Sequence, residues 1–379
     1  KHRLMSEAAR GEGGRVWVPR DVKDSRKPQD IPEEERFYFL EEWYPAYGNT
    51  VPRDVASRAI WKAVRHMGLG LGGKDMVYLD VSHLPRDFLD RRLGGILEMY
   101  ETFAGEDPRN GPMKIFPAVH YSMGGLWVDF EKDETTGGIV RKHPKNQSTN
   151  IPGLYACGEC DGAIHGANRL GANSLLSASY SGKVAGESAV SFIRNIEDGA
   201  VETDFAGELK RQEGINKRLT VSTGKENAFG LHAELGQIMQ DHVRVERNNE
   251  DLDKAIAGIR SLKERFGDVA LDDKAGWANT SLPYARQVYE MIVLGEVIAK
   301  SARMRDECRG AHYKPEFELK LPDAKPGEPA YDEYIRKWKA NNEKWAKTTV
   351  AKDSPEGPQI SYEDIDMSVY PPEVPRDYR

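Results

Sequence analysis

Residues 165–176, His-Gly-Ala-Asn-Arg-Leu-Gly-Ala-Asn-Ser-Leu-Leu, are the stretch from which the fold of this chain is best read. Small residues let a backbone approach a flat ligand closely, and Ser177 to Gly186 continue with the small residues typical of a closely packed helix. A helix start flanked by glycines favours an anion or an oxyanion as ligand. A tight loop without any ligand explains the same residues, so the neighbouring segments must decide.

The composition is that of an ordinary globular chain with an excess of negative charge. The 379 residues carry a net charge of −7, which argues against a nucleic-acid partner bound through phosphate contacts. No apolar run reaches the roughly 18 residues of a membrane-spanning helix. Cys157 and Cys160 form a lone Cys-x-x-Cys pair with no second pair, so we expect no metal site and a reducing compartment.

Hydrophobic periodicity divides the chain into four predicted domains, residues 1–115, 116–204, 205–310 and 311–379. The first mixes helices at 54–66 and 87–103 with a strand at 75–80. The second is predicted to be strand-rich, with strands at 126–130, 138–140 and 153–157, followed by the helix after the opening stretch. The third reads as a charged helical bundle, and the fourth as a surface tail with a helix near 331–347.

Other segments carry side chains suited to binding a small dicarboxylate. Glu7 and Arg10 would pair across one helical turn. Arg53 follows Pro52 at a predicted helix start, where the helix dipole disfavours a cation. His120 precedes a double-glycine turn. Together with Arg169 they suggest a pocket whose guanidinium groups clamp carboxylates, although a surface ion pair and a structural histidine remain open.

Taken in order, these motifs resemble the flavoprotein subunit of succinate dehydrogenase and fumarate reductase. The resemblance rests on four segments and continues into the tail: Val51-Pro-Arg-Asp54, His120-Tyr-Ser-Met-Gly-Gly125, Cys157-Gly-Glu-Cys160 and His165 to Leu175. Residues 112–119 and 39–48 look most like the version with a single diheme membrane anchor. The fold class that this implies is α/β with an added α domain. It consists of the second half of a Rossmann-like FAD-binding domain (116–204), an α+β capping domain (1–115) and a C-terminal helical bundle domain (205–310).

The resemblance also implies a role for each candidate residue. Arg53 would transfer the proton at the substrate, with Glu7 and Arg10 as its relay. Substrate binding would fall to Ser6, where the family usually has a threonine, and to His120 and Arg169; FAD binding would fall to Glu159, Asn173, Ser174 and Leu175. Ala172 stands where many relatives have glycine, and we expect the loop to tolerate it.

The expected reaction is the interconversion of succinate and fumarate by hydride transfer to or from FAD. The expected partners are an iron–sulfur subunit and, indirectly, a membrane anchor cytochrome b subunit, which would place the protein peripherally on the cytoplasmic face of the cell membrane. The family's first strand, its Gly-x-Gly-x-x-Gly turn and its flavin-linking histidine have no counterpart in this sequence. We therefore expect an N-terminally truncated chain that does not hold FAD stably by itself.

Two alternatives accompany this prediction. An L-aspartate oxidase shares the flavin and arginine motifs, but the long tail after Gly310 and the lack of an amine-binding signature disfavour it. A non-catalytic fragment that docks an iron–sulfur partner through residues 205–379 is the alternative of another class.

Overall fold

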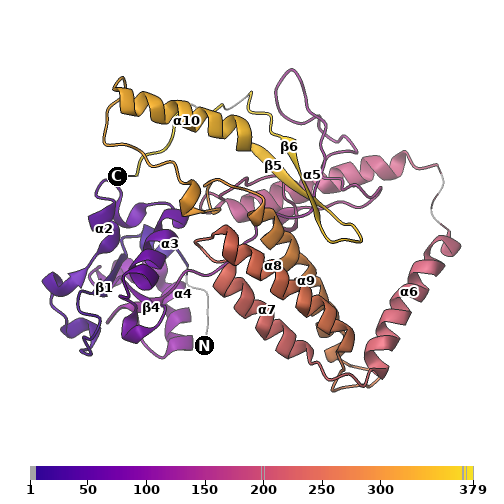
Figure 1. The fold of residues 1–379 in the computed structure, drawn as a ribbon, viewed down its shortest axis with the longest axis horizontal. Coiled ribbons are helices and arrows are strands. Elements are labelled where there is room, and N and C mark those ends of the chain that lie inside the picture. The colour runs from indigo at the N-terminus through magenta and orange to yellow at the C-terminus, as the bar shows by residue number, and fades with distance from the viewer. Residues whose placement is uncertain (1–5, 198, 200, 369–370, 373, 379) are drawn as a thin grey trace. The chain divides into compact units, whose positions relative to one another are not determined.

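The computed structural model describes residues 6–197, 199, 201–368, 371–372 and 374–378 (Figure 1). The chain divides into two compact units, one of residues 1–122 with 374–379 and the other of residues 123–373. Each unit has its own hydrophobic core, and the two cores share no residue. We therefore describe the units separately.

The first unit is built on a four-stranded antiparallel sheet in the order β2-β1-β3-β4. Its strands are β1 (Arg15–Pro19), β2 (Arg36–Phe37), β3 (Val77–Asp80) and β4 (Met113–Ile115), and its helices are α1 (Ala8–Gly11), α2 (Phe39–Trp43), α3 (Arg53–Trp61) and α4 (Arg86–Ala104). A turn of π-helix, Lys62–His66, extends α3. The two predicted helices and the predicted strand near 75–80 are confirmed, and together they give this unit the expected α+β composition.

Helix α4 illustrates how the sequence sets an element in this unit. Leu89, Leu93 and Leu97 recur every fourth residue and are all buried, so one stripe of the helix enters the core. The helix ends at Gly105, whose φ of +78° is a left-handed conformation that costs glycine little.

The second unit begins with an irregular region, and the strands predicted there are wrong. Among its described residues, 123–172 contain isolated bridges and no strand; the bridged pairs are Leu126↔Asp161, Asp129↔Ser148, Lys132↔Ile139 and Ser148↔Tyr155. Alternating apolar residues need a continuous neighbouring strand to form a ladder, and here each partner segment turns away after one pair. Helix α5 (Asn173–Arg194) then follows as predicted.

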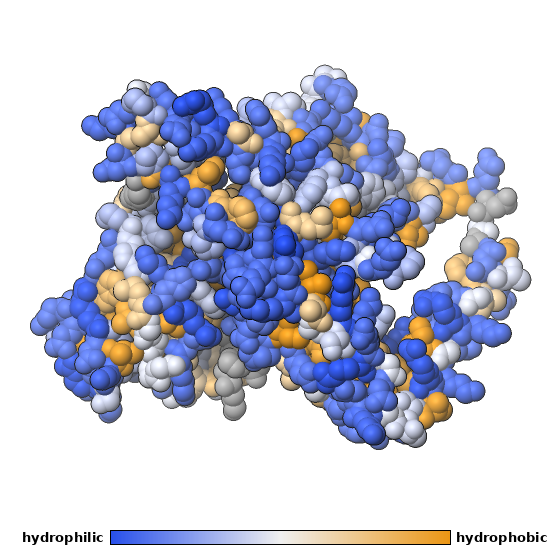
Figure 2. Space-filling view, viewed as in Figure 1, coloured by the Kyte–Doolittle hydropathy of each residue, from blue (hydrophilic) through white to orange (hydrophobic). Residues whose placement is uncertain are grey.

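The predicted helical bundle is confirmed. It contains α6 (Glu202–Val221), α7 (Ala228–His242), α8 (Asn249–Arg265) and α9 (Ser281–Arg303), of which α7, α8 and α9 lie side by side (Figure 1). The predicted apolar stripes face this core, with Leu231, Leu235, Leu252, Ile259 and Leu262 buried in it. By contrast, the N-cap Val201 and, in the first half of α6, Phe205 and Leu209 are exposed, and Figure 2 shows apolar side chains on this surface.

The tail forms the predicted helix and a hairpin. These are α10 (Pro329–Trp345), β5 (Lys347–Lys352) and β6 (Gln359–Asp364). Short 3₁₀ turns complete the chain at Pro28–Asp30, Glu33–Glu35, Gly48–Thr50, Leu71–Gly73, Gly158–Cys160, Phe266–Asp268 and Pro315–Phe317. Within the residues that the structure describes, no helix has both the length and the apolar character needed to cross a membrane.

Candidate functional site

Glu7 joins two arginines in the first unit. Its Oε1 accepts a hydrogen bond of 2.6 Å from Arg10 Nη2, and its Oε2 forms an ion pair with Arg53 Nη2. The predicted pairing of Glu7 with Arg10 across one helical turn is therefore confirmed. The Glu7 carboxylate therefore links the two guanidinium groups, Arg10 through a hydrogen bond and Arg53 through an ion pair.

Arg10 is buried and fixes the backbone that precedes Arg53. Its Nη1 donates to the carbonyl oxygen of Val51 at 2.6 Å and also to that of Asn49. Pro52 then occupies the N-cap of α3, so Arg53 becomes the first residue of the helix. The cation that the dipole disfavours at this position is compensated by the Glu7 carboxylate. This arrangement is more than the exposed surface ion pair that the sequence left open.

His120 and Ser6 also belong to the first unit. Arg53 Nη1 is 3.3 Å from His120 Nε2, so the two side chains predicted to act on one substrate are neighbours within the first unit. Ser6 is exposed at the start of α1, where its Oγ accepts a hydrogen bond of 3.2 Å from the Ala8 amide. We call Glu7, Arg10, Arg53 and His120 the arginine relay.

The second unit holds the other predicted residues, around the start of α5. Arg169 is only 5% exposed, and its Nη1 donates to the Leu170 carbonyl at 3.4 Å. His165 Nε2 is 3.0 Å from the hydroxyl of Ser177, which itself donates to the Ser174 carbonyl at 2.9 Å. Because the Ser177 proton is used there, His165 Nε2 is the donor in this hydrogen bond. Burial and the charge of Arg169 accordingly lower the pKa of His165.

The first turn of α5 is suited to a ligand with oxygen acceptors. Its N-cap, Ala172, supplies no side-chain hydrogen bond to the first turn, and Leu175 is 79% exposed. Nearby, Gly158 has φ of +76° and donates its amide to Ser181 Oγ at 2.8 Å, which holds the 3₁₀ turn against α5 and leaves the Glu159 carboxyl exposed. Helix amides, an apolar side chain and an acidic residue are groups that a flavin dinucleotide uses, so the residues present fit FAD.

The loop accommodates Ala172, as expected, but with strain. The φ of Ala172 is +64°, in the left-handed region. A side chain there costs roughly 1–2 kcal/mol relative to a right-handed conformation. The loop therefore keeps its shape under strain, because Asn173 and the following residues begin α5 immediately afterwards.

Sequence reasoning missed three contributors to these two groups of residues. The carbonyls of Asn49 and Val51, which receive Arg10, left no signal in the sequence, since every residue has a carbonyl. Ser177 could have been found, because a hydroxyl three residues after Ser174 in a helix commonly bonds back to the preceding turn.

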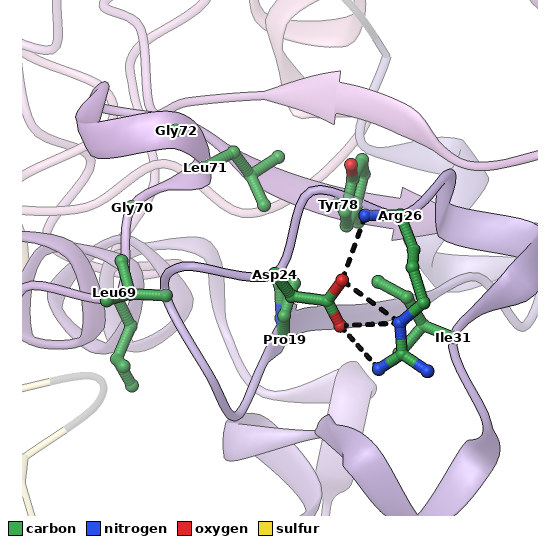
Figure 3. A pocket seen from close by; sticks show the side chains of 10 residues that line it. Pro19, Asp24, Arg26, Ile31, Leu69, Gly70, Leu71, Gly72 and Tyr78 are labelled. Atoms are coloured by element: carbon green, nitrogen blue, oxygen red, sulfur yellow. Dashed lines mark hydrogen bonds and ion pairs between the residues drawn. The ribbon is translucent and has the colours of Figure 1, made fainter.

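Two further features of the described chain bear on metal and ligand binding. No group of three or more His, Cys, Asp or Glu residues among the described residues could hold a metal ion. Cys160 Sγ instead donates to the Cys157 carbonyl at 3.2 Å. A small pocket in the first unit, lined by Leu71, Tyr78 and the Asp24–Arg26 pair, contains none of the predicted site residues (Figure 3).

Comparison with known proteins identifies the family. A model of the FAD binding domain matches residues 1–175, and a model of the fumarate reductase flavoprotein C-terminus matches residues 232–378. The succinate dehydrogenase flavoprotein subunit of Bacillus subtilis is 45% identical over 100% of this chain and 57% of its own length. The chain belongs to the succinate dehydrogenase and fumarate reductase flavoprotein family. The resemblance stated from the sequence is thereby confirmed.

Further relatives agree with this assignment. The fumarate reductase flavoprotein subunit of Escherichia coli is 33% identical over 82% of this chain and 49% of its own length. A structure of Escherichia coli quinol fumarate reductase superposes with a TM-score of 0.75 at 28% identity, covering 98% of this chain and 57% of that one. The chain thus spans a little over half the length of the flavoproteins that it matches best among these.

Proposed function

We propose that the protein containing this chain is a flavoprotein subunit that interconverts succinate and fumarate. FAD, when bound, supplies the hydride acceptor or donor of this reaction. The chain's own residues bind the dicarboxylate, orient it and move the proton that accompanies the hydride. The observation that carries the proposal is the arginine relay, because an arginine needs a carboxylate in direct contact with it, here Glu7, to exchange a proton.

Arg53 is the proposed proton-transferring residue. A free guanidinium, with a pKa above about 12, holds its proton too firmly to act alone near neutral pH. Contact with the Glu7 carboxylate gives the proton of Arg53 Nη2 an acceptor, and Arg10 on the other carboxylate oxygen continues the path. Arg53 would thus hold a proton at the substrate carbon and exchange it along the relay.

The dicarboxylate would be held by Arg169, His120 and Ser6. A guanidinium presents two parallel N–H donors to a carboxylate, and Arg169 is buried enough for such a contact to be strong. The Ser6 hydroxyl would donate to a substrate carboxylate oxygen, and His120 would do the same from its place beside Arg53. Bound charges near the reacting carbons also polarise the substrate toward reaction.

The proposed FAD contacts are Glu159, Asn173, Ser174 and Leu175. The exposed carboxylate of Glu159 suits a ribose hydroxyl, while the first turn of α5 offers amide donors to the oxygens of the ring system. We assign residues 116–204 to the second half of a Rossmann-like FAD-binding domain, 1–115 to the capping domain, 205–310 to the helical bundle domain and 311–379 to the tail.

Electrons would leave the flavin for an iron–sulfur subunit, with a cytochrome b subunit as the membrane anchor. With such an anchor, the protein would lie peripherally on the cytoplasmic face of the cell membrane. The solved relatives support such an assembly in general terms, because they are quinol fumarate reductases.

The proposal is tested with the full-length subunit in its complex and an artificial electron acceptor. Dye reduction is measured with succinate and with L-aspartate, and fumarate reduction is measured with a reduced dye. We expect turnover with succinate or fumarate and none with L-aspartate. Turnover of L-aspartate alone would replace the proposal by an amino-acid oxidase, and no turnover of any of the three would favour a docking role.

A further inference from the structure

A tight hairpin from the end of the bundle contacts the segment that carries Arg169. Arg309 and His312 are bridged by two backbone hydrogen bonds, of 2.8 and 3.0 Å, and Gly310 with Ala311 forms the turn between them. The Ala311 amide donates to the carbonyl oxygen of Ala167 at 2.9 Å. We call residues 309–312 the buttress hairpin.

Only glycine fits at position 310. Its φ is +56°, and a Cβ placed there would lie 2.4 Å from the Ala167 carbonyl oxygen and 2.9 Å from Asn168 Cβ. Real carbon atoms do not approach a backbone oxygen so closely, so either the hairpin or the Ala167 peptide would have to move. Gly72, which serves as the control position in the test, has a similar φ of +58°, but no atom lies within 4 Å of the position that a Cβ would take.

The hairpin is itself held firmly from several sides. His312 Nδ1 lies 3.0 Å from Arg247 Nη1, and its Nε2 is 2.8 Å from the Arg305 carbonyl. Since an arginine only donates, His312 accepts at Nδ1 and donates at Nε2. Arg309 donates to both oxygens of the fully buried Glu307 at 3.1 Å. A turn anchored in this way to several residues at one end of the bundle is held in a fixed position.

The contacted peptide lies midway between two of the side chains discussed above. Ala167 is two residues after His165, which bonds to Ser177, and two residues before the buried Arg169. The segment is thus fixed on one side to α5 and on the other to the buttress hairpin. A shift of the Ala167 carbonyl would be passed along two backbone links to the Cα of Arg169.

We propose that Gly310 and the buttress hairpin are positioning elements that set where the Arg169 guanidinium meets the substrate carboxylate. This rests on the proposed function, in which Arg169 binds the dicarboxylate. The hairpin touches neither reacting atoms nor cofactor in this role. It acts through the Ala167 carbonyl alone, so its effect is on dicarboxylate binding more than on the proton path of the arginine relay.

The test compares Gly310→Ala with Gly72→Ala in the full-length complex. Both variants put a side chain on a left-handed residue, but only the first also creates a clash. We expect Gly310→Ala to raise the KM for succinate and the Kd for malonate, read from the flavin spectrum, by about tenfold or more, with a smaller change in kcat. We expect Gly72→Ala to leave both constants unchanged. Equal constants in the two variants would overturn the proposal.

A second measurement covers the case in which Gly310→Ala does not assemble. Hydrogen exchange of the wild-type complex is followed by mass spectrometry with and without malonate. We expect peptides that cover 163–172 and 307–313 to gain protection together, because the hairpin supports the clamp. Protection of 163–172 alone would overturn the proposal. A wild type that is inactive on succinate and fumarate would instead overturn the proposed function, so the two failures are distinguishable.

Discussion

Glu7 is the residue on which the arginine relay depends, because its two oxygens contact two different guanidinium groups. In Glu7→Gln the neutral amide no longer accepts the proton of Arg53, although it keeps the size of the side chain. We expect kcat for succinate oxidation to fall by roughly 100-fold or more, with the KM changed much less. Steady-state assays of the full-length complex measure both constants.

A matched control for this variant lies five residues away. Glu12 forms an exposed ion pair of 2.6 Å with Arg92 and has no contact with the relay among those described. Glu12→Gln removes an acceptor of the same kind from the same short segment, and we expect kcat to stay within about twofold, as for other surface ion pairs. A similar loss of kcat in both variants would contradict a relay through Glu7.

Ala172 offers a prediction about stability. Its left-handed conformation is strained for alanine, so Ala172→Gly removes that strain, and the greater freedom of glycine in the unfolded chain offsets only part of the gain. We expect a net stabilisation of about 0.5–1 kcal/mol in urea denaturation. Ala189→Gly in the middle of α5 is the control, since helical glycine is expected to destabilise by about 1 kcal/mol. Destabilisation by both substitutions would refute the argument.

His312 makes stability depend on pH in a defined direction. Burial, and next the charge of Arg247, lower the pKa of His312 from 6.5 to about 4. The unfolded chain therefore takes up this proton first, and stability falls as the pH drops from about 6.5 to about 4. Arg247, Arg305 and Lys314 all face this ring with positive charge. Once the pH is below both pKa values, the free energy of unfolding has fallen by about 3 kcal/mol, because each unit of pKa difference contributes about 1.4 kcal/mol.

Denaturation of His312→Gln checks this prediction. Glutamine cannot take up a proton in this range, so the variant should be less stable than the wild type at pH 7 and should show a shallower decline between pH 6.5 and 4. The wild type and the variant are compared at half-unit pH intervals. Parallel pH profiles would mean that His312 is not the group responsible.

At the scale of elements, the stability of the bundle depends on buried apolar side chains, which recur at the helical period in the sequence. Ile259 of α8 is fully buried among α7, α8 and α9. Ile259→Ala removes three carbon atoms and leaves a cavity, so we expect the free energy of unfolding to fall by about 3 kcal/mol. Ile298→Ala on α9 is the control, because that side chain is 47% exposed and should cost less than about 1 kcal/mol. Urea denaturation followed by circular dichroism measures both.

The elements also show why sequence predicted some parts of this molecule and not others. The stripe of Leu252, Ile259 and Leu262 repeats at the helical period, and burial of one stripe is decided locally. The segment 126–130 alternates equally well, but a strand exists only if a distant segment pairs with it, and Asp129 meets only Ser148. The turn before α5 was predicted, whereas the contact of Gly310 with Ala167 joins residues far apart in the chain.

For the candidate site, sequence could identify the residue types but not their alignment. Glu7 and Arg10 are near neighbours in a helical turn, so their pairing followed from spacing. Arg53 contacts Glu7 because Arg10 binds two carbonyls of the turn before α3 and so fixes the start of the helix. A hydrogen bond to a backbone carbonyl cannot be predicted from the pattern of side chains. The strain at Ala172 was equally hidden, since it depends on φ and not on volume.

At the scale of the whole molecule, the two units have separate cores. One core includes Leu97 and the other includes Ile259, and no residue belongs to both. Regions with independent cores unfold in separate steps when few contacts couple them. We expect calorimetry of this chain to resolve two transitions, with Leu97→Ala lowering the midpoint of one and Ile259→Ala that of the other. A single transition shifted by both variants would show that the units unfold together.

The hydrogen bonds from Arg10 to the carbonyls of Asn49 and Val51 determine which segments can be exchanged between related flavoproteins. A chimera that imports only α3, with Arg53 at its start, would leave behind the residue that aligns the incoming helix. Residues 7–10 and 49–53 therefore have to be exchanged as one unit, although about forty residues of sequence separate them. Designers of hybrid enzymes should move both segments together or neither.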